Sequence, residues 1–243
     1  MTKIFGHRGA KAYYAENTLT SFRKALEMGA DGLELDIHYS KDGEIIVFHD
    51  FTLDRMCGVN GNIFDFTLAE LKQLKVQFKN QYEQIPTLQE VLELIKTFDQ
   101  ETGKATILNV EFKAGSDFYP NIETQTLSLC NRYLPKSQLI YSSFDHYALL
   151  KIKALDPEAQ TGILTASAMV APWEYTKRLN ADYYHPAYQS LTNRMLGEIK
   201  QHTLLLNAYT INDPSVAKGL IQYGIEGIIT DMPDVMIELR NNN

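Results

Sequence analysis

The sequence predicts a TIM (β/α)8 barrel, and three observations support this prediction. The length of 243 residues is close to the ~250 that one such barrel usually takes. Short β-rich runs alternate with amphipathic helical stretches, which is typical of a parallel sheet covered by helices. Eight such runs favour closure into a barrel. Periodicity does not show closure, so an open doubly wound sheet is the alternative fold.

The candidate core strands are short and are spread over the whole chain. They are Ile4–His7, Gly32–His38, Thr106–Glu111, Leu139–Ser143, Gln160–Leu164, Asp182–His185, Leu204–Thr210 and Gly227–Thr230. Between most of them, apolar residues recur at helical spacing, as in Thr18–Met28 and Val216–Tyr223.

A short turn motif recurs where a helical stretch leads into a strand. Gly29-Ala30-Asp31-Gly32 and Gly224-Ile225-Glu226-Gly227 share it, and Asn180-Ala181-Asp182 has Asn in the first position. Gly and Asn accept the left-handed conformation that ends many helices. The motif therefore predicts a helix-to-strand turn at each of these three places.

The interval from Phe51 to Lys104 contains no candidate core strand. It is too long for an ordinary connection around one helix, which uses about 2–6 residues on either side. Thr67-Leu68-Ala69-Glu70 and Thr87-Leu88-Gln89-Glu90 each have the Thr-x-x-Glu pattern of a capping box, which predicts two helix starts. We expect an ordered insertion at about 51–104, after the second core strand, within one domain covering residues 1–243.

Composition and charge narrow the classes of partner. The net charge of −7 argues against nucleic-acid binding, which usually requires a basic surface, but is compatible with a small phosphorylated substrate. Cys57 and Cys130 are too few for a disulfide framework. Met1-Thr2-Lys3 leads directly into the first strand, and no apolar run approaches the ~20 residues of a membrane span. We expect a cytoplasmic protein without stable membrane association.

Carboxylates occur on two candidate strands. Residues two apart in a strand point to the same side, so Glu34 and Asp36 share one face, and Glu111 and Lys113 share another. A barrel brings the carboxyl ends of its strands together, and three clustered carboxylates repel unless a cation neutralises them. Oxygen ligands of this kind suit Mg²⁺ or Ca²⁺. In the alternative interpretation, Glu34 and Asp36 are simply solvated or form salt bridges with Arg8 and Lys113.

Two histidines are candidates for acid–base chemistry. His7 ends the first strand, and His49 follows the apolar run that begins at Ile45 and forms a hairpin arm beside the Glu34–Asp36 strand. Two imidazoles placed across a phosphate give one base and one acid near neutral pH. Arg8 and Lys113 would supply positive charge to the phosphoryl oxygens.

The residues above fall within a longer ordered set of motifs that is similar to the signature of the glycerophosphodiester phosphodiesterase family. The matching segments are His7-Arg8-Gly9, Glu16-Asn17-Thr18, Glu34-Leu35-Asp36, His49-Asp50, Leu53-Asp54-Arg55, Ile85-Pro86-Thr87-Leu88, Glu111-Phe112-Lys113, Ser142-Ser143-Phe144 and Gly227-Ile228-Ile229-Thr230-Asp231-Met232-Pro233. Each motif is weak alone, but their common order along residues 7–233 is specific.

The resemblance implies a TIM barrel with an insertion after the second strand. It also implies roles, with His7 and His49 as the catalytic pair, Glu34, Asp36 and Glu111 as ligands of a divalent metal, and Arg8 and Lys113 as phosphate contacts. Asn17 would order the first loop and reach towards the phosphate. The implied reaction converts a glycerophosphodiester into glycerol 3-phosphate and an alcohol, through attack of the glycerol 2-hydroxyl and a cyclic phosphate.

Some positions depart from the family pattern or line the expected pocket. Tyr209 stands where the family usually has Trp, and Phe144 and His185 are further candidate pocket residues. Met56-Cys57 replaces small polar residues. The alternative functions are a phospholipase-type phosphodiesterase that releases a cyclic phosphate and a non-catalytic protein that binds glycerophosphodiesters.

Overall fold

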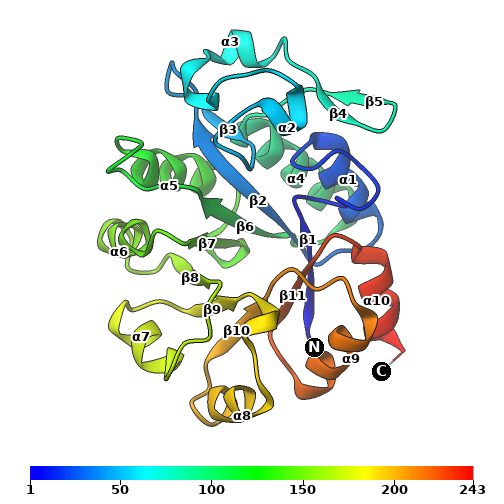
Figure 1. Cartoon of the computed structure of the whole chain (residues 1–243), viewed down its shortest axis with the longest axis vertical. Coiled ribbons are helices and arrows are strands. Elements are labelled where there is room, and N and C mark those ends of the chain that lie inside the picture. The colour runs from blue at the N-terminus through cyan, green and yellow to red at the C-terminus, as the bar shows by residue number, and fades with distance from the viewer. Residues whose placement is uncertain (243) are drawn as a thin grey trace.

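The computed structural model describes residues 1–242; residue 243, the last of the expected domain, lies outside the described range. Eight parallel strands form a closed barrel, because β1 pairs with both β11 and β2 (Figure 1). The barrel strands are β1 (Lys3–His7), β2 (Gly32–Tyr39), β6 (Ile107–Phe112), β7 (Leu139–Ser143), β8 (Gln160–Thr165), β9 (Tyr183–Pro186), β10 (Leu205–Ala208) and β11 (Gly227–Thr230).

Helices surround this barrel (Figure 1). They are α1 (Leu19–Glu27), α4 (Leu88–Thr102), α5 (Ile122–Tyr133), α6 (His146–Leu155), α7 (Pro172–Arg178), α8 (Asn193–Gln201), α9 (Pro214–Tyr223) and α10 (Pro233–Asn241), with short 3-10 turns η2 (Lys136–Gln138) and η3 (Tyr188–Ser190). Leu33, Leu35 and Ile37 on β2 point outward into the main core between strands and helices. Their neighbours Glu34 and Asp36 therefore point into the barrel.

The sequence predictions for the barrel are confirmed. All eight predicted strands are present, with ends that differ by at most two residues, and they close into a barrel instead of an open sheet. Gly29, Asn180 and Gly224 have φ values of 100°, 51° and 86°, the left-handed conformation predicted for the three helix-to-strand turns.

Extra structure follows β2. It consists of β3 (Ile45–Val47), which pairs antiparallel with β2, then α2 (Asp54–Cys57), η1 (Ile63–Asp65), α3 (Leu68–Leu71) and a hairpin of β4 (Val76–Phe78) and β5 (Gln81–Glu83). These elements have a small core of their own, which includes Ile46, Phe48, Leu53 and Leu71.

Both predicted capping boxes are present, with Thr67 capping α3 and Thr87 capping α4. However, α4 packs between α1 and α5 in the ring of barrel helices (Figure 1). The interval expected as an insertion, 51–104, therefore contains a barrel helix. A capping box marks where a helix begins, but not the layer in which it packs.

Across residues 1–242, no helix combines the length and the apolar character that crossing a lipid bilayer would require.

Candidate active site

Strand register brings the predicted site residues together. In the parallel pair of β1 and β2, His7 lies opposite Glu34, and in the pair of β2 and β6, Asp36 lies opposite Glu111. His7 is the last residue of β1 and Glu111 the last but one of β6, so the register places Glu34 and Asp36 of the longer β2 level with the carboxyl ends of their neighbours, the end where active sites of TIM barrels are found. Lys113 follows the last residue of β6 on the same side.

The three carboxylates expected to bind metal form one buried cluster. Glu34, Asp36 and Glu111 each offer an oxygen, and these atoms lie within 4.8 Å of one another. Burial, followed by the negative charges of Asp36 and Glu111, raises the pKa of Glu34 well above its usual range. Burial and the charge of Asp36 raise the pKa of Glu111 to about 7. The cluster therefore carries more negative charge than it can easily hold at neutral pH.

Two cations partly neutralise the cluster. Lys113 Nζ lies 2.7 Å from Asp36 Oδ1 and 2.5 Å from Glu111 Oε1, and Arg8 Nε lies 3.3 Å from Asp36 Oδ2. Burial alone would raise the pKa of Asp36, but Lys113 and Arg8 outweigh it and hold this pKa well below its usual range. The alternative interpretation, salt bridges to Arg8 and Lys113, therefore describes Asp36 but not Glu34, which forms no salt bridge with either cation in the described structure.

The donor set fits a divalent cation. Glu34 has no side-chain cation within salt-bridge distance other than His7, whose Nε2 lies 3.9 Å away, among the residues that the structure describes. Three buried carboxylates whose oxygens converge on one point are a usual setting for a hard ion such as Mg²⁺ or Ca²⁺. Binding such an ion would offset both the burial and the repulsion that raise the pKa values of Glu34 and Glu111.

His7 is oriented by a carboxylate from the last barrel strand. Its Nδ1 lies 2.6 Å from Asp231 Oδ1, and Asn212 Nδ2 donates to the other oxygen of Asp231 at 2.8 Å. Donation from Nδ1 leaves Nε2 free to face the carboxylate cluster. Burial lowers the pKa of His7, and the bond to Asp231 opposes this effect.

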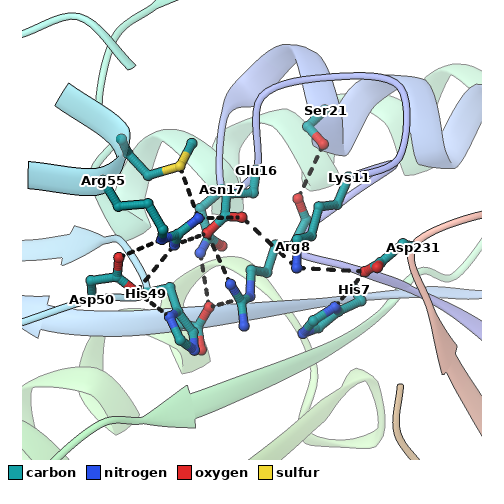
Figure 2. A network of polar contacts seen from close by, with 12 residues as sticks. His7, Arg8, Lys11, Glu16, Asn17, Ser21, His49, Asp50, Arg55 and Asp231 are labelled. Carbon is teal, nitrogen blue, oxygen red and sulfur yellow. Dashed lines mark hydrogen bonds and ion pairs between the residues drawn. The ribbon is translucent and has the colours of Figure 1, made fainter. Parts of the chain in front are cut away.

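His49, like His7, has a carboxylate that contacts its Nδ1. Its Nδ1 lies 2.5 Å from Asp50 Oδ1, and Arg55 binds the same carboxylate and also Glu16 (Figure 2). Burial lowers the pKa of His49, while the charge of Asp36 opposes this effect. The His49 side chain is 31% exposed and that of His7 only 12%, so His49 is nearer to solvent. Figure 2 shows the two imidazoles on either side of the Arg8 side chain.

The loop after β1 holds Arg8 and Asn17 in left-handed conformations, with φ values of 52° and 56°. Asn17 Nδ2 donates to Asp36 Oδ2 at 2.8 Å, and Thr18, not Asn17, caps α1. Asn17 therefore supports a carboxylate of the cluster, and its Oδ1 is buried without a hydrogen-bond partner in the described structure. Arg8 Nη1 donates to Glu16 at 2.9 Å, which ties this loop to the Arg55 network.

The candidate pocket residues have different surroundings. Phe144 is half exposed, and its ring packs edge-on against Tyr209, with centroids 6.1 Å apart. Tyr209 donates its hydroxyl to the carbonyl of Thr165. His185 is fully buried inside the barrel, where Asn207 Nδ2 donates to its Nε2 at 3.0 Å and burial lowers its pKa to about 3.

Sequence reasoning assigned no role to five residues that support the histidines: Glu16, Asp50, Arg55, Asn212 and Asp231. All but Asn212 lie in the motifs that resemble the family signature, but a motif does not show which side chain each residue contacts. Cys57, which replaces a small polar residue of the family, has a pKa raised by burial to about 11, so it is not a reactive thiolate.

Comparison with known proteins gives consistent matches. The model of the glycerophosphoryl diester phosphodiesterase family matches residues 7–235. A glycerophosphodiester phosphodiesterase of Caldanaerobacter subterraneus subsp. tengcongensis is 36% identical over 242 residues, which is 98% of this chain and 97% of that protein. Another, of Bacillus altitudinis, is 33% identical over 99% of this chain and 98% of that protein.

A solved structure is also similar to the whole chain. A phosphodiesterase from Oleispira antarctica, in complex with the product sn-glycerol-3-phosphate, has a TM-score of 0.90 and 29% identity, covering 99% of this chain and 97% of that one. These similarities define the molecule as a phosphoric diester hydrolase with a TIM-barrel fold. Within that class, the chain belongs to the glycerophosphoryl diester phosphodiesterase family.

Proposed function

We propose that this enzyme hydrolyses glycerophosphodiesters to glycerol 3-phosphate and an alcohol in a reaction that depends on Mg²⁺ or Ca²⁺. The observation that carries the proposal is the buried cluster of Glu34, Asp36 and Glu111 with the two histidines beside it. The Oleispira antarctica phosphodiesterase, with its bound sn-glycerol-3-phosphate, supports the identity of the product. The whole of residues 1–243 would act as one catalytic domain.

In this proposal, Glu34, Asp36 and Glu111 hold the cation. When bound, it supplies positive charge to the phosphoryl oxygens and lowers the pKa of the nearby glycerol 2-hydroxyl. Arg8 and Lys113 contact the phosphate. Lys113 is now engaged by Asp36 and Glu111, and a cation that neutralises these carboxylates would free the ammonium for the substrate.

The two histidines act as the acid–base pair. One accepts the proton of the 2-hydroxyl as its oxygen bonds to phosphorus, and the other donates a proton to the departing alcohol as the P–O bond breaks. Water then opens the resulting cyclic phosphate at the 2-oxygen with the roles reversed. We assign the first proton acceptance to His7, because its Nε2 faces Glu34, and the protonation of the alcohol to His49, which is nearer to solvent.

The orienting carboxylates support these roles. Asp231 and Asp50 each accept the Nδ1 proton of one histidine, so each Nε2 is left to exchange a proton with the substrate. The same arrangement stabilises an imidazolium once it forms. The two carboxylates act through the histidines, so they are positioning residues.

A turnover assay tests the proposal. Release of glycerol 3-phosphate would be measured with glycerophosphocholine, glycerophosphoethanolamine and glycerophosphoglycerol, each with Mg²⁺, Ca²⁺ or EDTA. We expect turnover with a divalent cation and loss of activity with EDTA. Binding without turnover under every condition would favour a non-catalytic binding protein, whereas a cyclic phosphate as the final product would favour the phospholipase-type reaction.

A further inference from the structure

His38 is a buried histidine that the proposed mechanism does not use. It continues the face of β2 that carries Glu34 and Asp36, because every second side chain of a strand points to the same side. Its side chain is fully buried, and a buried imidazole needs a partner for each ring nitrogen. Both partners are present. Nε2 lies 3.2 Å from the main-chain oxygen of His49, and Nδ1 lies 2.8 Å from the hydroxyl of Tyr119.

These two partners determine the direction of each hydrogen bond. A carbonyl oxygen can only accept, so Nε2 of His38 carries the proton and donates to His49. Nδ1 of the same neutral ring then has only a lone pair, and it accepts a hydrogen bond from the hydroxyl of Tyr119. The result is a chain of two hydrogen bonds that runs from Tyr119 through His38 to the main chain of His49.

The bond from His38 reaches His49 just beyond the end of a strand. β3 ends at Val47, and the N–H of Phe48 donates to the carbonyl of Asp36 at 3.0 Å. His49 follows, outside the strand. Its carbonyl is held by the His38 side chain, at the residue whose imidazole is proposed to protonate the departing alcohol. The bond therefore continues the attachment of this segment to β2 after the strand has ended.

Tyr119 is itself held in place by its loop. This loop joins β6 to α5 and begins at Lys113. The N–H of Tyr119 donates to the carbonyl of Gly115 at 2.9 Å, and the N–H of Ser116 donates to the buried carboxylate of Glu123 at 2.8 Å. The Tyr119 hydroxyl is thus presented to β2 by a loop with internal and external anchors.

Aromatic rings surround the His38 imidazole. The ring of Phe51 meets it edge to face at a centroid distance of 4.8 Å, and the ring of Tyr119 does so at 5.8 Å. Phe64 packs against Tyr119 at 6.4 Å. Hydrogen bonds in such a water-poor environment are electrostatically stronger than hydrogen bonds in water. The chain from Tyr119 to His49 is therefore a firm support.

Resting on the proposed function, we propose that His38 and Tyr119 are positioning residues for His49. They act on its main chain, whereas Asp50 contacts the Nδ1 of its ring, so His49 is fixed at two points. Both points must be correct for the His49 Nε2 to reach the oxygen of the departing alcohol, since a misplacement of about 1 Å can lower a rate by about 10²-fold. The partner of His7 is Asp231, so only the step that uses His49 should suffer when the chain is broken.

The molecule contains a matched control for this pair. His146, the first residue of α6, makes the same two contacts, with Nδ1 lying 2.9 Å from the Tyr175 hydroxyl and Nε2 lying 2.9 Å from the main-chain oxygen of Leu164. Leu164 belongs to β8 and has no role in the proposed reaction. Removing either tyrosine hydroxyl therefore breaks the same kind of bond, but only one of the two supports a catalytic residue.

The test compares two substrates that differ in their need for an acid. Choline must be protonated as it leaves glycerophosphocholine, whereas p-nitrophenolate leaves the p-nitrophenyl ester of glycerol 3-phosphate without a proton. Tyr119→Phe and His38→Leu should lower kcat for choline release about tenfold, leave KM within about twofold, and lower p-nitrophenol release less than about twofold. His38→Gln, whose amide can donate to the same carbonyl, should restore most of the choline release. Tyr175→Phe should leave both rates within about twofold of the wild type.

Two kinetic results would overturn the proposal. Losses of equal size on the two substrates in Tyr119→Phe and His38→Leu would mean that these residues only support the fold. An equal selective loss in Tyr175→Phe would mean that the effect is not specific to the chain that reaches His49.

A second measurement needs no turnover. In protein labelled with carbon-13 at the Cε1 of histidine, the His49 resonance should shift or split in Tyr119→Phe, which keeps the aromatic ring, and should stay in place in Tyr175→Phe. An unchanged His49 resonance in Tyr119→Phe would overturn the proposal. If His49→Ala slowed both substrates equally, the proposed role of His49 as the acid would be refuted, and the resonance would decide alone whether His38 and Tyr119 position it.

Discussion

Arg55 binds the carboxylate of Asp50 through two nitrogens. Nε lies 2.6 Å from Oδ2, and Nη2 lies 3.1 Å from Oδ1, the oxygen that also accepts the Nδ1 proton of His49. A paired contact of this type fixes the plane of the carboxylate. The orientation of the His49 ring therefore depends on a residue that does not contact it.

Replacing Arg55 tests this dependence. Burial alone would raise the pKa of Asp50, but its bonds to Arg55 and His49 hold this pKa at about 2. In Arg55→Gln the carboxylate is no longer shared and should stabilise the protonated form of His49, which raises the pKa of His49. We expect kcat to fall about tenfold, because His49 is no longer held in its orientation. The limb of the pH–rate profile that reports the pKa of His49 should move to higher pH. In Asp50→Asn the same limb should move to lower pH. Arg23→Gln on α1, where Arg23 pairs with Glu27, should do neither, and an unchanged profile in Arg55→Gln would show that the network is merely structural.

The assignment of His7 and His49 predicts different responses to the leaving group. His7→Ala and His49→Ala should each lower kcat on glycerophosphocholine by at least about 10²-fold. With a p-nitrophenyl ester, whose leaving group needs no proton, His49→Ala should recover most of the loss, and His7→Ala should not. The double variant should be little worse than the poorer single one, since the two act as a unit. Recovery in His7→Ala alone would reverse the two roles.

Asp231→Asn tests the partner of His7. The carboxylate bond opposes the lowering of the His7 pKa by burial, so its loss should lower that pKa further. We expect kcat to fall by about 10²- to 10⁴-fold, as in other imidazole–carboxylate pairs, with the acid limb of kcat/KM shifted to lower pH. The nearby Asp234→Asn, which loses only hydrogen bonds to the Tyr13 hydroxyl, is the control and should keep the wild-type profile. If the acid limb of the kcat/KM profile in Asp231→Asn stayed at the wild-type pH, Asp231 would not be the residue that tunes the pKa of His7.

The carboxylate cluster predicts a stability that depends on pH and on metal. The pKa of Glu111 is about 7 in the folded protein and 4.5 for an ordinary glutamate. Between these values the folded state binds more protons than the unfolded state, so the free energy of unfolding falls as pH rises. Without metal, the melting temperature should decrease from pH 5 to pH 8, and it should decrease less in Glu111→Gln. Saturating Mg²⁺ should stabilise the wild type most at pH 8 and the variant little. Equal pH dependence in the two proteins would contradict the repulsion within the cluster.

The nucleophile can be tested with a substrate that lacks it. If the glycerol 2-hydroxyl attacks phosphorus, a 2-deoxy analogue of glycerophosphocholine loses an intramolecular advantage that can reach ~7 kcal/mol. It should still bind through its phosphate but turn over very slowly, and glycerol 1,2-cyclic phosphate should be trappable early in the reaction of the true substrate. Turnover within about tenfold of the native rate would mean that water attacks directly.

The barrel was predictable from sequence because its signals are local. Alternating strands and helices, left-handed residues such as Gly29 and capping residues such as Thr87 each depend on a few neighbouring positions. The packing of α4 in the barrel ring was not predictable, since the residues that start a helix do not determine its layer.

The candidate site was predictable to the extent that strand periodicity determines it. Glu34 and Asp36 are two residues apart, so their common direction follows from the pleat of the strand. The bond between His7 and Asp231 joins positions 224 residues apart. It exists because the last strand closes against the first, and register across that closure is a property of the whole barrel. Arg55 could be recognised in a motif, but its contacts with Asp50 and Glu16 depend on how the segment after β3 folds against the loop after β1, which no local pattern predicts.

The position of Lys113 between Asp36 and Glu111 has a consequence for the proposed binding of a metal ion. Its ammonium group already offsets part of the charge of two of the three carboxylates without any metal. Binding of the proposed divalent cation would therefore be an ion exchange, in which the incoming cation displaces a cation that is covalently part of the chain.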